Sequence, residues 1–459
     1  MQMFQDLINW ILGFGASVFV PIIMIIAGLI VKMKPKDAIS AGLLLGIAFT
    51  GMSEVINFMR GAITPVAEAM IKATGVQLSI MDGGWTTMSV ISWAWPYAFA
   101  MFPLQIGINI LLLALGKTKT FNADLWNVWG KIFTAVIVMG TTNSVVLAFV
   151  VASIQIVLEL WSSDAHQKRL QKMSGIPGVT CSHRTLFFSC ILWPFDMILR
   201  KIPFLNKEFG VAQLRDKIGI FAENHVLGFI LGCVFGIIGR YDIVNILKLG
   251  LVAGTAMTLF PMVTKLFMQA LAPISEAVQA YMQKRFKDRE LYVGLDWPYL
   301  GGANEIWIAV IAIVPMLVIY SFILPGNNLL PFAGVINLSL AVPAWIVTKG
   351  NVPRMLILCA IGAPVFLCVG TAIAPYMSQL AMQTGAVELA AGELISNSSI
   401  NAPVFTYATQ LFAFLQGNFL PLIVAVVWGT CWVLYTRWLK KEDALMEQEE
   451  QAQASSEIQ

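Results

Sequence analysis

The chain has 459 residues, of which 58% are hydrophobic and only 12% are charged, and its mean hydropathy is +0.76. An ordinary soluble domain carries about 25% charged residues, so this composition excludes a water-soluble globule and indicates a membrane protein. The net charge of +3 gives no reason to expect a nucleic-acid partner.

Long apolar runs recur along the whole chain. A helix of about 20 residues crosses a hydrocarbon core of about 30 Å, and about eleven runs approach or exceed that length. The first run has no basic n-region and no small-residue cleavage site, so we expect a retained helix and not a signal peptide. The sequence therefore predicts an all-α polytopic membrane protein with helices in residues 7–31, 39–59, 86–115, 128–160, 184–199, 225–239, 249–272, 306–324, 331–348, 353–375 and 411–436.

Basic residues are concentrated in short gaps between these runs, which predicts that those gaps face the cytoplasm. We expect one membrane domain over residues 1–438, followed by a polar, disordered cytoplasmic tail over 439–459. The basic clusters are Lys32, Lys34 and Lys36; Lys168, Arg169 and Lys172; Arg200, Lys201 and Lys207; Lys284, Arg285, Lys287 and Arg289; and Arg437, Lys440 and Lys441.

Residues able to bind metals or attack substrates are few and scattered. The six cysteines lie mostly within apolar runs, with no CxxC and no His-paired spacing, and the chain has only three histidines. No Ser/His/Asp or Cys/His arrangement is visible either. We therefore expect no metal, no cofactor and no catalytic nucleophile.

Two short segments are near copies of each other. ITPVAEAM at residues 63–70 and LAPISEAV at residues 271–278 share Pro65, Glu68 and their counterparts Pro273 and Glu276. Internal repeats are typical of transporters, in which two copies surround a site near the membrane midplane. The pattern predicts repeat halves at about 7–200 and 215–436, although chance or a shared amphipathic composition is the alternative.

Polar residues follow helix-breaking turns in both halves. DGGW contains Asp82 and Trp85, and GLDWPYLGGANE contains Asp296, Asn304 and Glu305. Irregular backbone at membrane depth survives only when it is buried in protein or lines water. Re-entrant hairpins at these turns would direct carboxylates, amides and indoles into one cavity, where they suit a sugar or polyol. The alternative is that the aspartates cap helices at the membrane surface.

Further candidates stand beside other apolar runs. Glu223, Asn224 and His225 precede LGFILGCVFG, and helix capping is the simpler reading of them. NADLWNVWG places Asp124 and Asn127 beside two tryptophans, which an interfacial aromatic belt would explain equally well. His183, after a basic loop, suits a solvated or phosphate-facing role as well as a sugar contact.

Six segments, in order along the chain, resemble one family. They are DGGW at 82–85, DLWNVW at 124–129, FAENHVLGFILG around Glu223, RYDI at 240–243, YVGLD at 292–296 and PGNNLLPF at 325–332. Together they resemble the galactitol-type IIC membrane component of the bacterial phosphoenolpyruvate-dependent phosphotransferase system. The likeness spans about residues 5–440, and GLD in register with PGN-x-x-LPF is its most specific part.

The resemblance implies a homodimeric permease in the bacterial cytoplasmic (inner) membrane. It implies a scaffold domain, a core domain that moves as an elevator, and phosphorylation of the incoming solute by a phosphocysteine on a separate IIB protein, itself charged by IIA. We expect neither IIA nor IIB within this chain, so it is not an enzyme by itself. The site residues carried over are Asp82, Trp85, Asp124, Asn127, Glu223 and Asp296.

Three histidine positions of that family differ here. The chain has Gly130 after DLWNVW, Ser182 followed by His183, and Ala303 with Asn304 after YVGLD, while Asn224 replaces a proline. Loss of imidazoles changes the hydrogen-bonding options of a site. Galactitol, a related polyol, a pentose and a sugar acid therefore all stay open as solutes. An ion-coupled secondary transporter and a solute-binding receptor without transport are the alternative functions.

Overall fold

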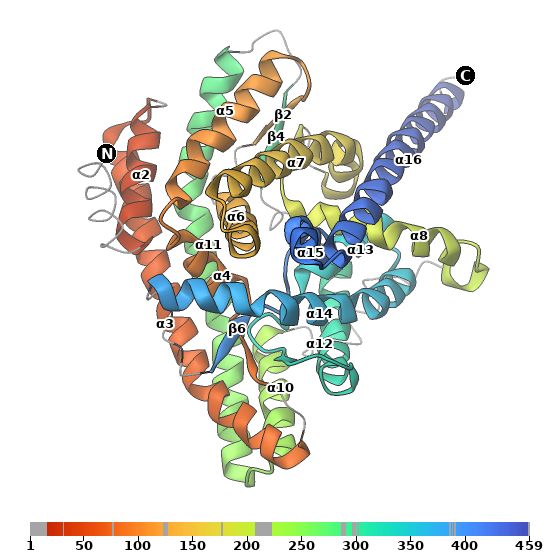
Figure 1. Cartoon of the computed structure of the whole chain (residues 1–459). Helices are drawn as coiled ribbons and strands as arrows, with labels where there is room; N and C mark the ends of the chain where they lie inside the picture. Colours follow the sequence, from red (N-terminus) through yellow and green to blue (C-terminus); the bar gives the residue numbers. More distant parts are fainter. Residues whose placement is uncertain are drawn as a thin grey trace.

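Helices dominate the computed structural model, which describes residues 16–30, 32–75, 78–122, 127–175, 178–206, 223–285, 291–295, 300, 303–384, 387, 389 and 392–457. Figure 1 shows the whole chain. The first half contains α2 (Ala16–Ile30), α3 (Pro35–Thr74), β1 (Ile80–Asp82), α4 (Gly84–Trp93), η1 (Ala98–Ala100), α5 (Met101–Ala114), β2 (Thr120–Asn122), α6 (Val128–Thr142), α7 (Val145–Ser174), β3 (Val179–Cys181), η2 (Arg184–Phe188), α8 (Ser189–Leu199) and η3 (Pro203–Asn206).

The second half presents its strands and helices in a similar order. It contains α10 (Asn224–Ile238), α11 (Ile243–Arg285), β4 (Tyr292–Leu295), α12 (Asn304–Ile323), β5 (Leu329–Leu330), α13 (Leu338–Thr348), α14 (Val352–Thr384), β6 (Leu394–Ser396), α15 (Pro403–Ala408), η6 (Leu411–Gln416) and α16 (Leu420–Glu457). Each half thus begins with a helix pair, continues with a short strand, and places two further strands between later helices.

Two small sheets correct the all-α expectation. The first, sheet A, has the order β5-β1-β6, and the second, sheet B, has the order β2-β4-β3; every pairing is parallel. The middle strand of each sheet comes from one half of the chain and both flanking strands come from the other half. Strands of two to four residues show too little alternation for a sequence pattern to reveal them.

The two longest helices contain the repeated prolines. Pro65 lies inside α3 and Pro273 inside α11, and the separation from Pro35 to Pro65 equals that from Ile243 to Pro273. The repeated segments are therefore the last parts of two long helices.

Local breaks divide several predicted apolar runs. Run 128–160 is split between α6 and α7, because Asn143 adopts the left-handed conformation with φ of 52° and ends α6. Ser144 then caps α7 by accepting a hydrogen bond from Leu147 N at 3.3 Å. Run 86–115 is likewise divided between α4, η1 and α5.

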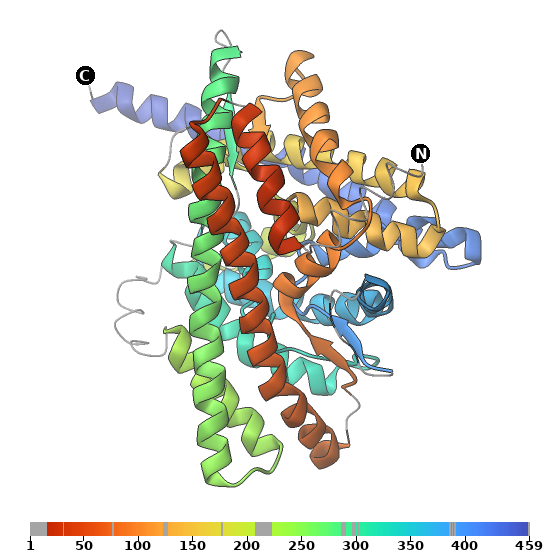
Figure 2. The same cartoon turned by 90° about the vertical axis from the view of Figure 1, so that its left-hand side faces the viewer.

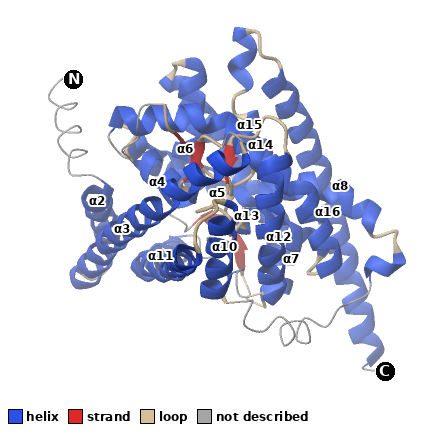
Figure 3. Ribbon diagram, turned by 90° about the horizontal axis from the view of Figure 1, so that it is seen from below, coloured by secondary structure: helices blue, strands red, loops and turns tan. Residues whose placement is uncertain are grey.

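Helices α2, α3, α10 and α11 pack mainly on one another, and we call them the four-helix unit. Figures 2 and 3 show them from the side and from below. Backbones of α10 and α11 nearly touch, since a Cβ on Gly232 would lie 2.6 Å from Leu249 O and one on Gly228 would lie 2.7 Å from Ala253 O. Such glycine-mediated approach is typical of helix pairs in membranes.

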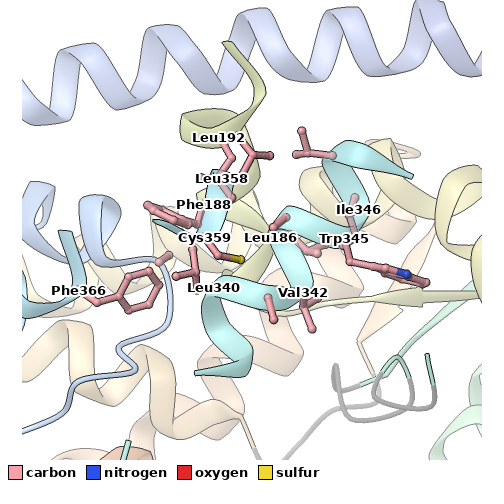
Figure 4. Close-up of a cluster of buried hydrophobic side chains, with 14 of the residues drawn as sticks. Leu186, Phe188, Leu192, Leu340, Val342, Trp345, Ile346, Leu358, Cys359 and Phe366 are labelled. Carbon is pink, nitrogen blue, oxygen red and sulfur yellow. The ribbon is translucent and has the colours of Figure 1, made fainter. Parts of the chain in front are cut away.

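The remaining helices surround the two sheets and form the sheet-containing unit. Its larger apolar cluster joins η2, α8, α13 and α14, and Figure 4 shows Phe188, Leu340, Cys359 and Phe366 packed together. Contact with the four-helix unit includes Phe235 on α10 and Phe332, whose ring centroids are 6.0 Å apart.

The C-terminal segment is helical in the structure, whereas the sequence predicted a disordered tail. Residues 439–457 continue α16, and their first turns are held by ion pairs. Arg169 contacts Glu442 and lies 3.1 Å from Asp443, and Arg200 lies 2.8 Å from Glu442. The acidic residues that suggested a solvated tail instead anchor α16 to α7 and to the end of α8.

Three described helices are long and apolar enough to cross a membrane by length and composition: Val145–Ser174, Val352–Gln383 and Leu420–Leu445. Shorter apolar helices, among them α5, α6 and α13, accompany them. The chain is thus a mostly helical membrane protein, and the number of about eleven spans stays a prediction.

Candidate functional site

The carboxyl end of sheet A is organised by Asp82, the last residue of its middle strand. The Oδ1 atom accepts hydrogen bonds from Gly84 N at 3.0 Å and Ser398 N at 3.1 Å. The Oδ2 atom accepts from Phe332 N at 2.7 Å, Gly334 N at 2.9 Å and Ser398 Oγ at 2.5 Å. One carboxylate therefore ties together the loops that follow all three strands of the sheet.

These hydrogen bonds use the full accepting capacity of the carboxylate, which is about four lone-pair positions. Burial raises the pKa of Asp82, and the hydrogen bonds from Ser398, Phe332 and Gly334 oppose that shift. Four amide N–H donors require an acceptor, so the ionised form is the one that this site fits. In this structure Asp82 positions the surrounding loops and has no acceptor position left for a solute.

The loop after β6 is rich in buried amides and hydroxyls. Asn397 Oδ1 accepts from Ser399 N at 2.8 Å, and Asn337 Nδ2 donates to Ser398 O at 3.1 Å. Ala402, with φ of 53°, holds a backbone conformation that L-residues rarely adopt, directly before α15. A strained, polar loop of this kind is typical of ligand sites.

Arg184 connects the carboxyl ends of the two sheets. It follows β3 of sheet B, and its Nε donates to Asn401 O, beyond β6 of sheet A, at 3.0 Å. Its other nitrogens donate to Gly130 O and Thr134 Oγ1, both at 3.0 Å, and to Thr406 Oγ1. The two strand ends thus face a common buried polar centre.

The charge of Arg184 is stabilised by aromatic rings as well as by these acceptors. The guanidinium carbon lies 5.3 Å from the Phe133 ring centroid and 5.7 Å from that of Phe405. A Cβ on Gly130 would lie 3.4 Å from Arg184 Cδ, so the arginine packs directly beside this glycine.

The carboxyl end of sheet B places Ser182 and His183 beside each other in the buried interior. Ser163 Oγ donates to Cys181 O at 2.8 Å and lies 3.2 Å from Ser182 Oγ. A Cβ on Gly294 of β4 would lie 1.8 Å from Ser182 Oγ, so this strand position requires glycine. The serine therefore sits directly over the middle strand.

His183 presents one ring nitrogen without a protein partner in the part of the chain that the structure describes. Thr185 N donates to its Nδ1 at 3.2 Å, so the ring hydrogen of the neutral form lies on Nε2. Burial, with Lys131 and Arg184 nearby, lowers the pKa of His183 well below 6.5 and keeps the ring neutral. The side chain is only 2% exposed, and it offers one buried N–H donor at the end of sheet B.

Asn127 begins α6 at the same end of sheet B and is buried. Its Oδ1 accepts from Trp129 Nε1 at 3.1 Å, and its carbonyl accepts from Lys131 Nζ at 3.3 Å. Lys131 also forms an ion pair of 2.5 Å with Glu159 on α7, and both side chains are 1% exposed. Trp129 packs in the apolar core, so its indole is a structural anchor.

Asp124 and Asp296 lie outside the described residues, in segments 123–126 and 296–299. In the sequence, segment 123–126 directly follows β2, a flanking strand of sheet B, and segment 296–299 directly follows β4, its middle strand.

Other predicted residues lie elsewhere. Trp85, half-buried on α4, packs against the apolar cluster that contains Trp129. Glu223 is exposed at the start of α10 and makes no capping hydrogen bond, and His225 is also exposed there. Asn224 and Asn304 are the first residues of α10 and α12, and their side chains lie outside the described part.

Glu305 is separated from the polar centre. A Cβ on Gly350 would lie 3.9 Å from Glu305 Cγ, which places the glutamate beside the turn after α13. Asn337 caps the other end of α13, next to the polar loops. Eleven helical residues span about 16 Å, so Glu305 does not share the polar centre.

Sequence reasoning missed several residues that the structure brings to this centre. Arg184 and Thr185 begin an apolar run, while Asn397, Ser398 and Asn401 belong to a polar stretch, NSSIN, that no predicted helix covered. That stretch of five residues between apolar runs was the available signal. The ion pair of Lys131 with Glu159 was detectable as two opposite charges inside one apolar run.

The centre is suited to bind a molecule with many hydroxyl groups. Each hydroxyl both donates and accepts, and the centre combines amides, hydroxyls, backbone groups and one imidazole N–H. Aromatic rings lie beside it, at Phe133 and Phe405.

Comparison with known proteins points in the same direction. The chain matches the family described as "PTS system sugar-specific permease component" over residues 10–392. It is 30% identical over 414 residues to the "PTS system galactitol-specific EIIC component" of Escherichia coli (strain K12), covering 90% of this chain and 92% of that protein. It is 31% identical over 381 residues to a "Putative permease IIC component" of the same organism, covering 82% and 87%. The chain therefore belongs to the family of sugar-specific EIIC permease components of the phosphotransferase system.

Proposed function

We propose that this permease carries a sugar alcohol across the bacterial cytoplasmic membrane and presents it to a separate IIB protein for phosphorylation. The relatives' printed names make galactitol the first solute to test. The observation that carries the proposal is the buried polar centre between the carboxyl ends of two parallel sheets, enclosed by helices of membrane-spanning character.

Solute contacts are proposed at the sheet B end of this centre. The described polar side chains there are the buried Asn127, Ser182 and His183. Asp124 and Asp296, which lie outside the described residues, are proposed as further solute contacts. At the sheet A end, the carboxylate of Asp82 is fully used by backbone donors. We therefore assign Asp82 and Arg184 to positioning the loops, and the sheet B end to binding.

Transport is proposed to occur by movement of the sheet-containing unit along the four-helix unit. Each sheet takes strands from both halves of the chain, so the halves of the sheet-containing unit are joined and would move together. The four-helix unit would supply the contact of a homodimer. Exposed apolar residues at helical spacing on α3, namely Ile39, Leu43 and Ile47, suit lipid or a second copy.

The chemical step is proposed to belong to the partner. A hydroxyl of the solute attacks the phosphorus of a phosphocysteine, an O–P bond forms, the S–P bond breaks, and the hydroxyl proton passes to solvent or to the released thiolate. The permease contributes orientation and exclusion of water. Of the described cysteines, Cys181, Cys190 and Cys359 are buried. Because buried thiols are poor nucleophiles, we propose no chemical role for these three.

Uptake by membrane vesicles tests this function. Vesicles that contain the permease, supplied with IIA, IIB and phosphoenolpyruvate, should accumulate phosphorylated galactitol or a related polyol. Ser182→Ala and Asn127→Ala should lower solute affinity, whereas the exposed Asn245→Ala should not. Accumulation of free solute driven by an ion gradient would instead establish a secondary transporter.

A further inference from the structure

The amino end of sheet B is surrounded by exposed basic residues. Lys117 and Lys119 lie on the turn before β2, Lys168 and Lys172 lie near the end of α7 before β3, and Lys284 lies near the end of α11 before β4. We call these five exposed lysines the basic collar. Figure 2 shows the ends of α5 and α11 at the same end of the molecule.

Ordered contacts hold the collar to the sheet. Lys119 N donates to Asp164 Oδ1 at 3.2 Å, and Tyr292 N donates to Lys119 O at 2.9 Å. Trp161, with 41% of its surface exposed, donates its indole N–H to Lys117 O at 3.1 Å. The Lys119 ammonium lies 5.7 Å from the centre of the Tyr292 ring. Aromatic side chains such as the exposed Trp161 and the half-buried Tyr292 are of the types enriched at protein interfaces, and the lysines around them would steer a negatively charged partner.

The amino end of sheet A carries fewer such charges, with the exposed Lys72 in the last turn of α3 before β1. The segments before its strands, GVQLS at 75–79, LPGNN at 324–328 and GAVELAAGE at 385–393, contain no lysine or arginine and include two glutamates. Since the two sheets are built alike, the fold itself does not require the collar. The positive-inside bias explains which membrane face is basic, but not why the lysines surround a strand edge with aromatic residues.

Distance connects the collar to the solute. Strands β2, β3 and β4 have three or four residues, and at about 3.3 Å per residue the sheet is only about 10 to 13 Å from end to end. The collar lies at one end, and Asn127, Ser182 and His183 lie at the other. A protein docked on the collar would be separated from the proposed solute position by the thickness of one short sheet.

We propose that the basic collar is the docking surface for the phosphorylated IIB protein, whose negatively charged phosphoryl group complements its charge. This proposal depends on the proposed function, because it names the place where the phosphoryl donor of that function binds. Long-range attraction of this kind acts mainly on the rate of association and weakens as salt rises.

Charge reversal tests the collar. The triple variant Lys117→Glu, Lys119→Glu, Lys168→Glu should raise the KM for phosphorylated cognate IIB about tenfold or more at low salt, with kcat little changed. Raising the salt from about 0.02 M to about 0.3 M should raise the wild-type KM and leave that of the variant nearly constant. Solute affinity, measured without IIB, should equal that of wild type, which shows that the variant is folded and inserted.

The matched control reverses Lys34, Lys36 and Lys201, which are exposed basic residues outside the collar. Its KM for phosphorylated IIB should stay within about twofold of wild type. A collar variant with unchanged KM, or a control with an equal increase, would overturn the assignment. Failure of the proposed function is distinguishable, because wild-type permease would then show no IIB-dependent phosphorylation at all.

Discussion

The ion pair of Lys131 with Glu159 gives the sharpest prediction for the interior. The two groups are 2.5 Å apart, join α6 to α7, and are 1% exposed. Replacing Lys131 with methionine keeps the volume and removes the charge. Glu159 then keeps one described hydrogen bond, from Gln155 Nε2 at 2.8 Å, and its buried carboxylate loses its ion-pair partner, with Arg184 as the remaining positive charge that acts on it.

The size of the effect follows from the geometry. At an effective dielectric constant of 20, two unit charges 2.5 Å apart attract by about 7 kcal/mol, which the cost of removing both from water largely offsets. Removal of one partner leaves that cost uncompensated, so Lys131→Met should destabilise the protein by about 3 to 5 kcal/mol. The double variant Lys131→Met with Glu159→Gln should recover at least half of this loss, because no unpaired charge remains.

Thermal unfolding in detergent, followed by loss of solute binding, measures the difference. Lys131→Met should lower the Tm by several degrees, and the exposed Lys201→Met should change it little, since surface substitutions are usually within about 0.5 kcal/mol. The reasoning fails if Lys131→Met melts like wild type. It also fails if the double variant is no more stable than the single one.

Three other perturbations follow from the structure. Asp82→Asn replaces a carboxylate that accepts five hydrogen bonds with an amide whose NH2 group would face backbone N–H donors. This variant should therefore lose solute binding and have a lower Tm, whereas the exposed Asp37→Asn should change neither. Equal solute binding by both variants would contradict the positioning role of Asp82. Gly232→Val should prevent the packing of α10 on α11, because its Cβ would lie 2.6 Å from Leu249 O. Gly107→Val, whose Cβ would have no atom within 4 Å, should accumulate normally in membranes. The yield of monodisperse protein measures both outcomes. Burial depresses the pKa of His183 below that of an unfolded histidine, so its contribution to stability should be full above pH 6.5 and should decline as the pH falls, by at most about 1.4 kcal/mol per pH unit. His183→Gln should remove this pH dependence from Tm measurements between about pH 5 and pH 8. Identical pH dependence of the Tm in wild type and variant would contradict the assignment to His183.

Much of the helical architecture was predictable from hydropathy, because membrane-spanning helices need long apolar runs. The similar segments around Pro65 and Pro273 do occupy equivalent places in α3 and α11, and the division of the chain into two repeats stays a prediction. The break at Asn143 was not predictable, since a single left-handed residue between two apolar helices leaves no mark in a hydropathy pattern.

The polar centre was only partly predictable. Asp82 was recognised as unusual, but its partners, Phe332, Gly334 and Ser398, are backbone groups and a hydroxyl far along the chain, which no local pattern reveals. The role of Arg184 could not be recognised from the sequence, because it is the first residue of an apolar run and its acceptors are neutral carbonyl and hydroxyl oxygens. Glu305 drew attention through its sequence neighbours, yet α13 separates it from the centre.

The exchange of strands between halves has a consequence for biogenesis. Strand β1 leaves the ribosome before β5 and β6, its two neighbours in sheet A, have been translated. The interval from Asp82 to Ser396 corresponds to roughly 15 to 60 s of translation at 5 to 20 residues per second. Throughout that time the nascent Asp82 lacks its donors on Phe332, Gly334 and Ser398, so the first half of the chain enters the membrane with this carboxylate incompletely hydrogen-bonded. Two chains emerging side by side from a polysome could pair each other's strands during this delay, which makes translation speed a determinant of correct assembly.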